Sequence, residues 1–177
     1  MLHAENMTSQ PEFNILFLCT GNSARSLIAE GLMRHLSQGR IGAYSAGSFP
    51  TGAPHPNALE ILSEHQVDIH FARSKSWDEF AGADSPEMDV IITVCDNAAG
   101  ESCPLWPGHP ATAHWGVADP AAVTGSADQV RVAFLRTYQQ FHARITTFLS
   151  TEPYKMTAGE GARMVSSHFP SEPSLPE

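Results

Sequence analysis

The feature that most constrains the fold is an apolar run that leads directly into a cysteine, a short loop and a helix. Residues 13–18 are nearly all apolar, which is typical of a strand buried on both faces of a sheet. Cys19 follows, then five small or polar residues, and then Arg25. From Ser26 onward, apolar residues recur every fourth position and predict an amphipathic helix: Ile28, Leu32 and Leu36. Cys19 and Arg25 are therefore expected at the two ends of one tight loop between a strand and a helix.

The composition of this loop predicts an anion-binding site. Gly21 lets the backbone curl so that successive amide groups converge on one point. The N-terminus of the following helix and the guanidinium fork of Arg25 add to the binding of a tetrahedral dianion. The same field favours a thiolate, so we expect Cys19, whose free pKa would be about 8.5, to be largely ionised at neutral pH. The Ser26 hydroxyl could add a donor to that sulfur. The expected anion-binding residues are Thr20, Gly21, Asn22, Ser23, Ala24, Arg25 and Ser26.

Length and charge limit the function classes that need to be considered. The chain has 177 residues, enough for one compact domain with a sizeable core. Its formal net charge is −9 and we find no basic cluster, which argues against binding to nucleic acid or to an anionic membrane. No apolar run approaches the roughly 18 residues that span a bilayer, and residues 1–12 lack the features of a secretion signal. We therefore expect a cytoplasmic protein that acts on a small anion.

Apolar runs alternate with helical patterns along most of the chain. Further strands are expected at residues 41–46 and 88–95, and helices at residues 26–38 and 56–65. A short helix before the last of these strands could be capped reciprocally by Ser76 and Glu79. This alternation predicts a parallel sheet with helices on both sides.

A long helix and a tail are expected in the last third of the chain. Within residues 128–149, apolar residues fall three or four positions apart and form one stripe: Val130, Phe134, Tyr138, Phe141, Ile145 and Phe148. After Ser150, prolines, glycines and serines replace large apolar residues, which is typical of a flexible segment. We therefore expect a domain of residues 13–150 between flexible segments at residues 1–12 and 151–177.

Two further cysteines favour redox chemistry. Cys95 ends an apolar run and should lie, like Cys19, at the carboxyl edge of the sheet, where ligands bind in such folds. Cys103 follows after a segment of small and polar residues that can move. A thiolate bonded to an oxidant is released when a second thiol attacks its sulfur, and a third thiol can carry the disulfide away. Three cysteines in a reducing compartment favour such chemistry over a disulfide framework, and their spacing fits a zinc site poorly.

These motifs resemble those of a known family. The segment from Cys19 to Ser26 is similar to the phosphate-binding loop of low-molecular-weight protein-tyrosine phosphatases and of the arsenate reductases that share their fold. Residues 93–95, 103–104 and 114–121 resemble the corresponding segments of thioredoxin-coupled arsenate reductases, whereas ordinary phosphatases of this family lack the cysteine pair. Those phosphatases commonly carry tyrosines where this chain has Ala121 and Ala122. The resemblance covers roughly residues 14–149.

The resemblance implies a fold and a reaction. The fold would be a single α/β three-layer domain, in which a four-stranded parallel sheet has helices on both faces. The reaction would be reduction of arsenate to arsenite, in which Cys19 attacks arsenic while Arg25 and loop amides hold the oxygens. Cys95 would then attack the sulfur of Cys19, and Cys103 would move the disulfide to the pair Cys95 and Cys103. Thioredoxin, or alternatively glutaredoxin with glutathione, would reduce that pair. No cofactor is expected, and weak phosphatase activity is allowed.

The resemblance also assigns an acid and contains two departures. Pro120 pushes Asp119 toward an extended backbone, in a loop that the resemblance places over the anion site. A carboxyl group there can protonate the departing oxygen. Ala24 stands where many relatives have an additional cysteine, which is not one of the three relay thiols. The interval from Cys95 to Cys103 is one residue longer than in relatives, which leaves the geometry of the final disulfide open.

A lysine is expected in place of a metal ion, with a solvated Lys75 as the alternative. Several relatives hold a potassium ion with side chains that match Asn22, Glu30 and Ser45, and with further ligands from the segment aligned to residues 72–76. This chain has Lys75 in that segment. A fixed ammonium group repels a cation and could take its place by pairing with Glu30. We therefore expect Glu30, Ser45 and Lys75 to support the loop without a metal ion.

Two alternative functions remain open from the sequence. The first is a low-molecular-weight protein-tyrosine phosphatase, in which Cys19 alone carries the reaction. The second is a non-catalytic oxyanion or redox sensor that binds a regulatory partner through residues 151–177. A buried structural Cys19 beside a surface Arg25 would support none of these functions.

Overall fold

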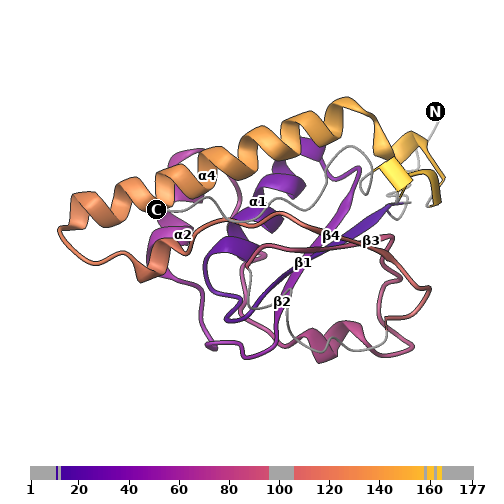
Figure 1. Cartoon of the computed structure of the whole chain (residues 1–177), viewed down its shortest axis with the longest axis horizontal. Coiled ribbons are helices and arrows are strands. Elements are labelled where there is room, and N and C mark those ends of the chain that lie inside the picture. The colour runs from indigo at the N-terminus through magenta and orange to yellow at the C-terminus, as the bar shows by residue number, and fades with distance from the viewer. Residues whose placement is uncertain (1–10, 12, 96–105, 158, 162, 165–177) are drawn as a thin grey trace, which may run out of the picture.

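The strands of the computed structural model form one parallel sheet (Figure 1). The structure describes residue 11 and residues 13–95, 106–157, 159–161 and 163–164. In chain order the strands are β1 (Asn14–Cys19), β2 (Gly42–Gly47), β3 (Val90–Thr93) and β4 (Ala111–His114). Their order in the sheet is β2-β1-β3-β4. The expected four-stranded parallel sheet is therefore confirmed.

The register of the central strand brings two cysteines to the same edge of the sheet. Cys19 is the last residue of β1 and lies opposite Gly47 of β2. On the other side of β1, Leu18 pairs with Thr93, and the Val94 amide donates to the Leu18 carbonyl at 2.9 Å. Because β1 and β3 are parallel, Cys95 follows its strand at the edge where Cys19 ends β1.

Three helices cover one face of the sheet. They are α1 (Arg25–Ser37), α2 (Pro56–Glu64) and α4 (Ala127–Ser150), which pack against one another (Figure 1). The predicted stripe of α4 is buried at Phe134, Tyr138, Phe141, Ile145 and Phe148. Fully burying one such phenylalanine contributes about 2 kcal/mol. A capping box between Ser126 and Gln129 begins α4, so both the caps and the apolar stripe hold this helix in place.

The other face carries a smaller apolar cluster under a short helix. Leu16, Leu18 and Ile91 pack there against Phe80 of η1 (Trp77–Phe80), a 3₁₀ helix. Ser76 caps η1 by accepting a hydrogen bond from the Asp78 amide. The reciprocal cap expected from Glu79 is wrong, because the Glu79 carboxylate pairs with the guanidinium of Arg73 at 2.8 Å instead.

The segment after α4 folds back onto the domain, which differs from the flexible tail expected after residue 150. Pro153 in η3 (Pro153–Lys155) is buried, and so is Met164. The Arg40 guanidinium lies 4.5 Å from the centre of the Tyr154 ring and donates to its hydroxyl. A Cβ atom added to Gly161 would lie 2.3 Å from the Phe13 ring. Residues 1–10 and 165–177 lie outside the described residues, so their flexibility stays a prediction.

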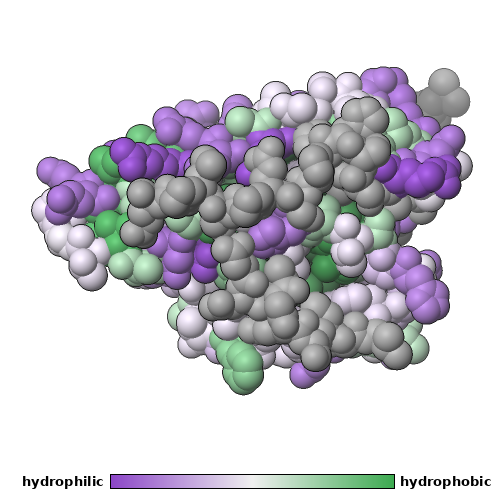
Figure 2. Space-filling view, in the orientation of Figure 1, coloured by the Kyte–Doolittle hydropathy of each residue, from purple (hydrophilic) through white to green (hydrophobic). Residues whose placement is uncertain are grey.

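The surface is mostly polar where it can be seen. In the view of Figure 2, hydrophilic residues predominate along the outer side of the molecule, and apolar residues appear in small separate groups. The most exposed large apolar side chain among the described residues is Phe49. Within the described part of the chain, none of the helices combines the length and the apolar character needed to cross a bilayer.

Candidate active site

The loop between β1 and α1 is wrapped by the loop that follows β2. Backbone amides of the outer loop donate to carbonyl oxygens of the inner loop in three pairs: Phe49 to Thr20 at 2.9 Å, Thr51 to Gly21 at 3.0 Å, and His55 to Ser23 at 2.8 Å. A trans peptide points its C=O and its N–H in opposite directions. The outward carbonyls therefore turn the amides of Gly21, Asn22 and Ala24 inward, and the Gly21 amide acts to lower the pKa of Cys19. We call residues 20–26 the cradle.

Asn22 holds the cradle in its tightest turn. Its φ of 44° lies in the left-handed region, which asparagine adopts more easily than most residues. Its buried side-chain amide donates to the hydroxyls of Ser26 and Ser45, both at 2.9 Å. Its side-chain oxygen accepts from the Lys75 backbone amide at 2.9 Å. The Ser26 hydroxyl therefore braces Asn22, where the sequence suggested a contact with Cys19.

Gly47 lets β2 approach the cradle more closely than any other residue type would. A Cβ atom at this position would lie 2.4 Å from the Thr20 carbonyl oxygen and 3.0 Å from the Asn22 amide nitrogen. Real Cβ atoms essentially never come within 3.0 Å of a heavy atom outside their own residue and its chain neighbours. The glycine is therefore required for the present path of the cradle.

Cys19 and Cys95 are both buried. The neighbouring Cys95 side chain and the loss of solvation raise the pKa of the Cys19 thiol, while the Arg25 charge and the Gly21 amide act in the opposite direction. The Thr20 hydroxyl lies 3.6 Å from the Cys95 sulfur. In this arrangement the pKa of Cys19 is raised, where the residue types led us to expect ionisation, because residue types do not show how close Cys95 lies.

Arg25 connects the cradle to the loop that carries the predicted acid. One guanidinium nitrogen donates to the Val117 carbonyl at 3.0 Å, and another lies 3.5 Å from a carboxylate oxygen of Asp119. The other carboxylate oxygen of Asp119 accepts from the Ala121 amide at 3.0 Å, at the start of η2 (Pro120–Ala122). The Asp119 side chain is 40% exposed and that of Arg25 is 15% exposed. Asp119 thus lies at the solvent side of the guanidinium.

A buried charge cluster lies behind the cradle. The Lys75 ammonium donates to the Arg73 carbonyl at 3.0 Å and to the Ser45 hydroxyl at 3.4 Å, and lies 3.7 Å from Glu30. Ser45 in turn donates to the Glu30 carboxylate. Burial raises the pKa of Glu30, although the charges of Lys75 and Arg34 act to lower it. Burial lowers the pKa of Lys75, although the charge of Glu30 acts to raise it. Each charge therefore compensates part of the desolvation of the other.

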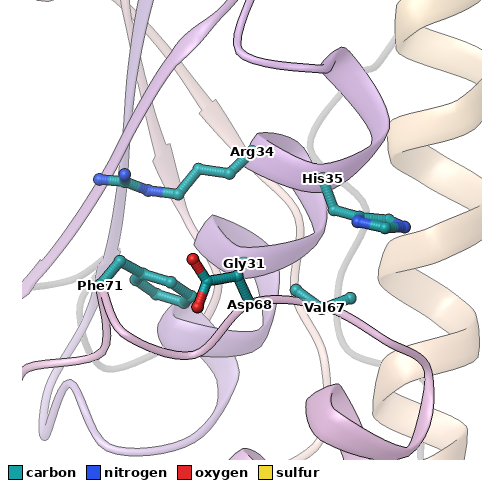
Figure 3. Close-up of a pocket in the computed structure, with 6 residues that line it drawn as sticks. All are labelled: Gly31, Arg34, His35, Val67, Asp68 and Phe71. Carbon is teal, nitrogen blue, oxygen red and sulfur yellow. The ribbon is translucent and has the colours of Figure 1, made fainter.

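Arg34 extends this cluster to the surface. It donates to Glu30 at 3.0 and 3.2 Å, and its guanidinium lies 5.1 Å from the centre of the Phe71 ring. Figure 3 shows Arg34 pointing toward the side of α1 where Phe71 lies, whereas His35 points to the opposite side. A cavity of about 250 Å³ opens between α1 and the segment of residues 67–71. Its lining residues are Gly31, Arg34, His35, Val67, Asp68 and Phe71.

The structure places most of the predicted residues together. Cys19, Cys95, Arg25 and Asp119 lie at the carboxyl edge of the sheet, and the cluster of Glu30, Ser45 and Lys75 lies behind the cradle. Cys103 lies outside the described residues, so its role stays a prediction. Within the described residues, no group of three or more His, Cys, Asp and Glu side chains is arranged to hold a metal ion.

Sequence reasoning missed the backbone contacts of the site. The contact of the Val117 carbonyl with Arg25 and the donors from the loop after β2 involve main-chain atoms. Such contacts leave no signal in residue type. Among the residues of the site that were not predicted, Gly47 is the one whose identity indicated its role. A glycine directly after a predicted strand marks a close approach of two backbone segments.

Comparison with known proteins agrees with this geometry. The profile of the family described as "Low molecular weight phosphotyrosine protein phosphatase" matches residues 14–157. An arsenate reductase of Shouchella clausii is 37% identical over 138 residues, which cover 77% of this chain and 95% of that protein.

Solved structures agree with the same assignment. A thioredoxin-dependent arsenate reductase of Corynebacterium glutamicum has a TM-score of 0.61 at 25% identity over 84% of this chain, but the match covers only 65% of that longer chain. An arsenate reductase in a phosphate-binding state has a TM-score of 0.58 at 27% identity, over 76% of this chain and 98% of its own. The sequence profile, the relatives and the fold agree, and the chain belongs to the low molecular weight phosphotyrosine protein phosphatase family.

Proposed function

We propose that this protein reduces arsenate to arsenite with the thiols of Cys19, Cys95 and Cys103. The observation that carries the proposal is the pair of buried cysteines at one edge of the sheet, where the Cys95 sulfur lies 3.6 Å from the hydroxyl of Thr20, the residue that follows Cys19. A phosphatase of this kind needs one sulfur, whereas a second sulfur close by gives the first a direct route to a disulfide. The arsenate reductases among the relatives and structural neighbours support the same reaction.

In the first step, arsenate binds to the inward amides of the cradle and to Arg25. Cys19 passes its thiol proton to the bound oxyanion, and its sulfur attacks arsenic and forms the S–As bond. The opposite As–O bond breaks, and Asp119 protonates the departing oxygen, which leaves as water. Arg25 lies close enough to Asp119 to hold this carboxyl group over the same anion. Arsenic is still in its oxidised state at this point.

In the second step, the electron pair moves to arsenic. The Cys95 thiolate attacks the Cys19 sulfur, the S–As bond breaks, and its electron pair stays on arsenic, which leaves as arsenite. The two sulfurs are oxidised to a disulfide. Cys103 then attacks the Cys95 sulfur, which releases Cys19 as a thiolate and moves the disulfide to Cys95 and Cys103.

A dithiol protein must reduce the final disulfide. Thioredoxin is our proposed donor, because one structural neighbour is a thioredoxin-dependent arsenate reductase. Glutaredoxin with glutathione is the alternative. Both donors belong to a compartment that keeps thiols reduced, so we place the reaction in the cytoplasm. Neither nucleic acid nor a membrane has a part in it.

We also propose that the enzyme works without a metal ion. Residues that match the potassium ligands of relatives, Glu30 and Ser45, already contact the Lys75 ammonium. This donor set does not fit a potassium ion, because the ammonium would repel it at short range. Lys75 supplies the positive charge instead, and its backbone amide also holds Asn22 of the cradle.

A weaker second activity on aryl phosphates follows from the same cradle. The Arg25 charge acts on the Cys19 sulfur, and Arg25 also pairs with Asp119. Phosphoryl transfer to a cysteine needs this combination of nucleophile, cation and acid. Phosphorus does not readily accept the electron pair of the S–P bond, so a phosphorylated Cys19 must wait for water. This activity therefore needs neither Cys95 nor Cys103.

The decisive assay measures arsenate-dependent loss of NADPH in the presence of thioredoxin and thioredoxin reductase. The wild type should sustain turnover, and changing Cys19, Cys95 or Cys103 to serine should abolish it. Cys95→Ser should keep its hydrolysis of an aryl phosphate. A wild type that hydrolyses aryl phosphates but reduces no arsenate with thioredoxin or glutaredoxin would identify a phosphatase. Binding of arsenate without any turnover would identify a sensor.

A further inference from the structure

A histidine at the start of α2 contacts both the cradle and the long helix α4. The His55 backbone amide donates to the Ser23 carbonyl of the cradle at 2.8 Å. Its ring packs on the Phe134 ring of α4, with the ring centres 4.8 Å apart. We propose that His55 is a positioning residue, which fixes the Ala24 amide of the anion cradle by capping α2. The proposal deepens the proposed function, because it concerns how that site binds its oxyanion.

The capping role rests on the geometry of the first turn of α2. His55 has an extended backbone, with φ of −69° and ψ of 131°, and its Nδ1 accepts a hydrogen bond from the Asn57 amide at 3.2 Å. Pro56, which has no amide hydrogen, follows it. An accepting Nδ1 requires the neutral ring with its proton on Nε2. Histidine is not among the favoured capping residues, so its presence here needs a second reason.

The second reason is the packing of the ring. Residues with smaller capping side chains would satisfy the Asn57 amide but would leave the Phe134 ring of α4 without this neighbour. The imidazole does both, and it thereby fixes the His55 backbone between two helices. His55 is therefore held by two contacts of its side chain, with the Asn57 amide and the Phe134 ring, and by one hydrogen bond of its backbone amide.

The consequence for the cradle follows from peptide geometry. The Ser23 carbonyl and the Ala24 amide belong to one planar peptide unit and point in opposite directions. When His55 holds the carbonyl outward, the amide is held inward, toward the oxyanion. Without the cap, the first turn of α2 can fray, and the His55 amide no longer fixes the orientation of that peptide. The Ala24 amide would then be a less well-ordered hydrogen-bond donor to a bound oxyanion.

Three substitutions of His55 distinguish the effect of the capping hydrogen bond from the effect of the ring packing. His55→Asn keeps a capping acceptor and removes the ring, His55→Phe keeps a ring against Phe134 and removes the acceptor, and His55→Ala removes both. Ser126→Ala is the matched control, because Ser126 caps α4 through the Gln129 amide and has no contact with the cradle among the bonds described. Each lost cap should lower the melting temperature by a comparable amount.

The measurement is the dissociation constant of inorganic phosphate by calorimetry at pH 8, with arsenate KM and kcat from the coupled assay. His55→Ala and His55→Phe should raise the phosphate Kd roughly fivefold, the equivalent of one cap. His55→Asn should stay within about twofold of the wild type, and Ser126→Ala should lower the melting temperature without changing the Kd.

Two results would overturn the role of His55. The first is an unchanged phosphate Kd in His55→Ala, with a loss of melting temperature equal to that of Ser126→Ala. The second is rescue by His55→Phe and not by His55→Asn, since the cap would then be irrelevant. A wild type that binds phosphate but reduces no arsenate would refute the proposed function alone, and the phosphate constants would still decide the role of His55.

Discussion

The side chains of Cys19 and Cys95 are both buried at the edge where β1 and β3 end. One sulfur lies beside the cradle, and the other follows the neighbouring strand. This proximity has two effects of opposite kind. It makes Cys19 harder to ionise, and it places the second thiol where it can attack the first.

Removing Cys95 should make Cys19 more reactive toward alkylation. Because the pKa of Cys19 is raised, its thiolate fraction at neutral pH is below that of a free thiol and increases as the pH rises. Cys95→Ala removes the largest cause of the shift, so the alkylation profile should move to lower pH. Mass spectrometry of iodoacetamide-treated protein measures the rate at Cys19, with unfolded protein as the reference. Identical profiles in the wild type and Cys95→Ala would contradict this reading.

Adding one methyl group behind the cradle should disable anion binding. In Gly47→Ala the new Cβ would lie 2.4 Å from the Thr20 carbonyl oxygen, so the cradle must move. We expect kcat/KM for arsenate to fall roughly 100-fold, as for a misplacement of about 1 Å. Gly82→Ala is the control, because its Cβ would have only an ordinary contact at 3.7 Å with the Ser85 side chain. Equal activity in the two variants would show that the cradle tolerates the shift.

Replacing the predicted acid should slow the chemical step and spare binding. Asp119→Asn cannot protonate the departing oxygen, so the single-turnover rate of arsenite formation should fall by about 10²- to 10⁴-fold. The phosphate Kd should not rise, because the substitution takes a competing carboxylate away from Arg25. An unchanged rate of arsenite release would assign the proton to another donor.

The buried ion pair should matter more for stability than its exposed neighbour. Lys75→Met leaves the buried Glu30 carboxylate with only Arg34 as a charged partner, and should cost on the order of 3 kcal/mol of unfolding free energy. Arg73→Ala breaks an ion pair whose side chains are 60% and 44% exposed, and should cost less than about 1 kcal/mol. Denaturant titration measures the free energy of unfolding of both variants.

The wild type should reduce arsenate equally well in potassium and sodium salts, because the Lys75 ammonium takes the place of a metal ion. A clear gain of activity in potassium would refute metal independence.

The pattern of apolar residues predicted β1 and α4 correctly. The positions that are buried in these elements are the positions that carry apolar residues in the sequence. The apolar run of residues 13–18 corresponds to β1, and the stripe within residues 128–149 is buried in α4. The strand β4 was not identified, because only Ala113 of its four residues is buried at this edge of the sheet. The packing of the described residues after α4 was also missed, because it depends on single contacts such as that of Tyr154 with Arg40.

The site was predictable only in part. Residue types and their positions indicated Cys19, Arg25 and Cys95, because their chemistry is specific, whereas Asp119 was assigned through the family resemblance. The ionisation of Cys19 could not be read from sequence, since it depends on a distance between two thiols. The donors that orient the cradle are backbone amides, whose positions depend on the tertiary path and not on residue identity.

The most direct test of the three-cysteine relay is a single turnover without any external reductant. Fully reduced protein mixed with excess arsenate should release one arsenite per protein and lose two free thiols, with a disulfide between Cys95 and Cys103 found by peptide mapping. Cys95→Ser should release no arsenite and retain its aryl phosphatase activity. Arsenite release by Cys95→Ser equal to that of the wild type would contradict the account.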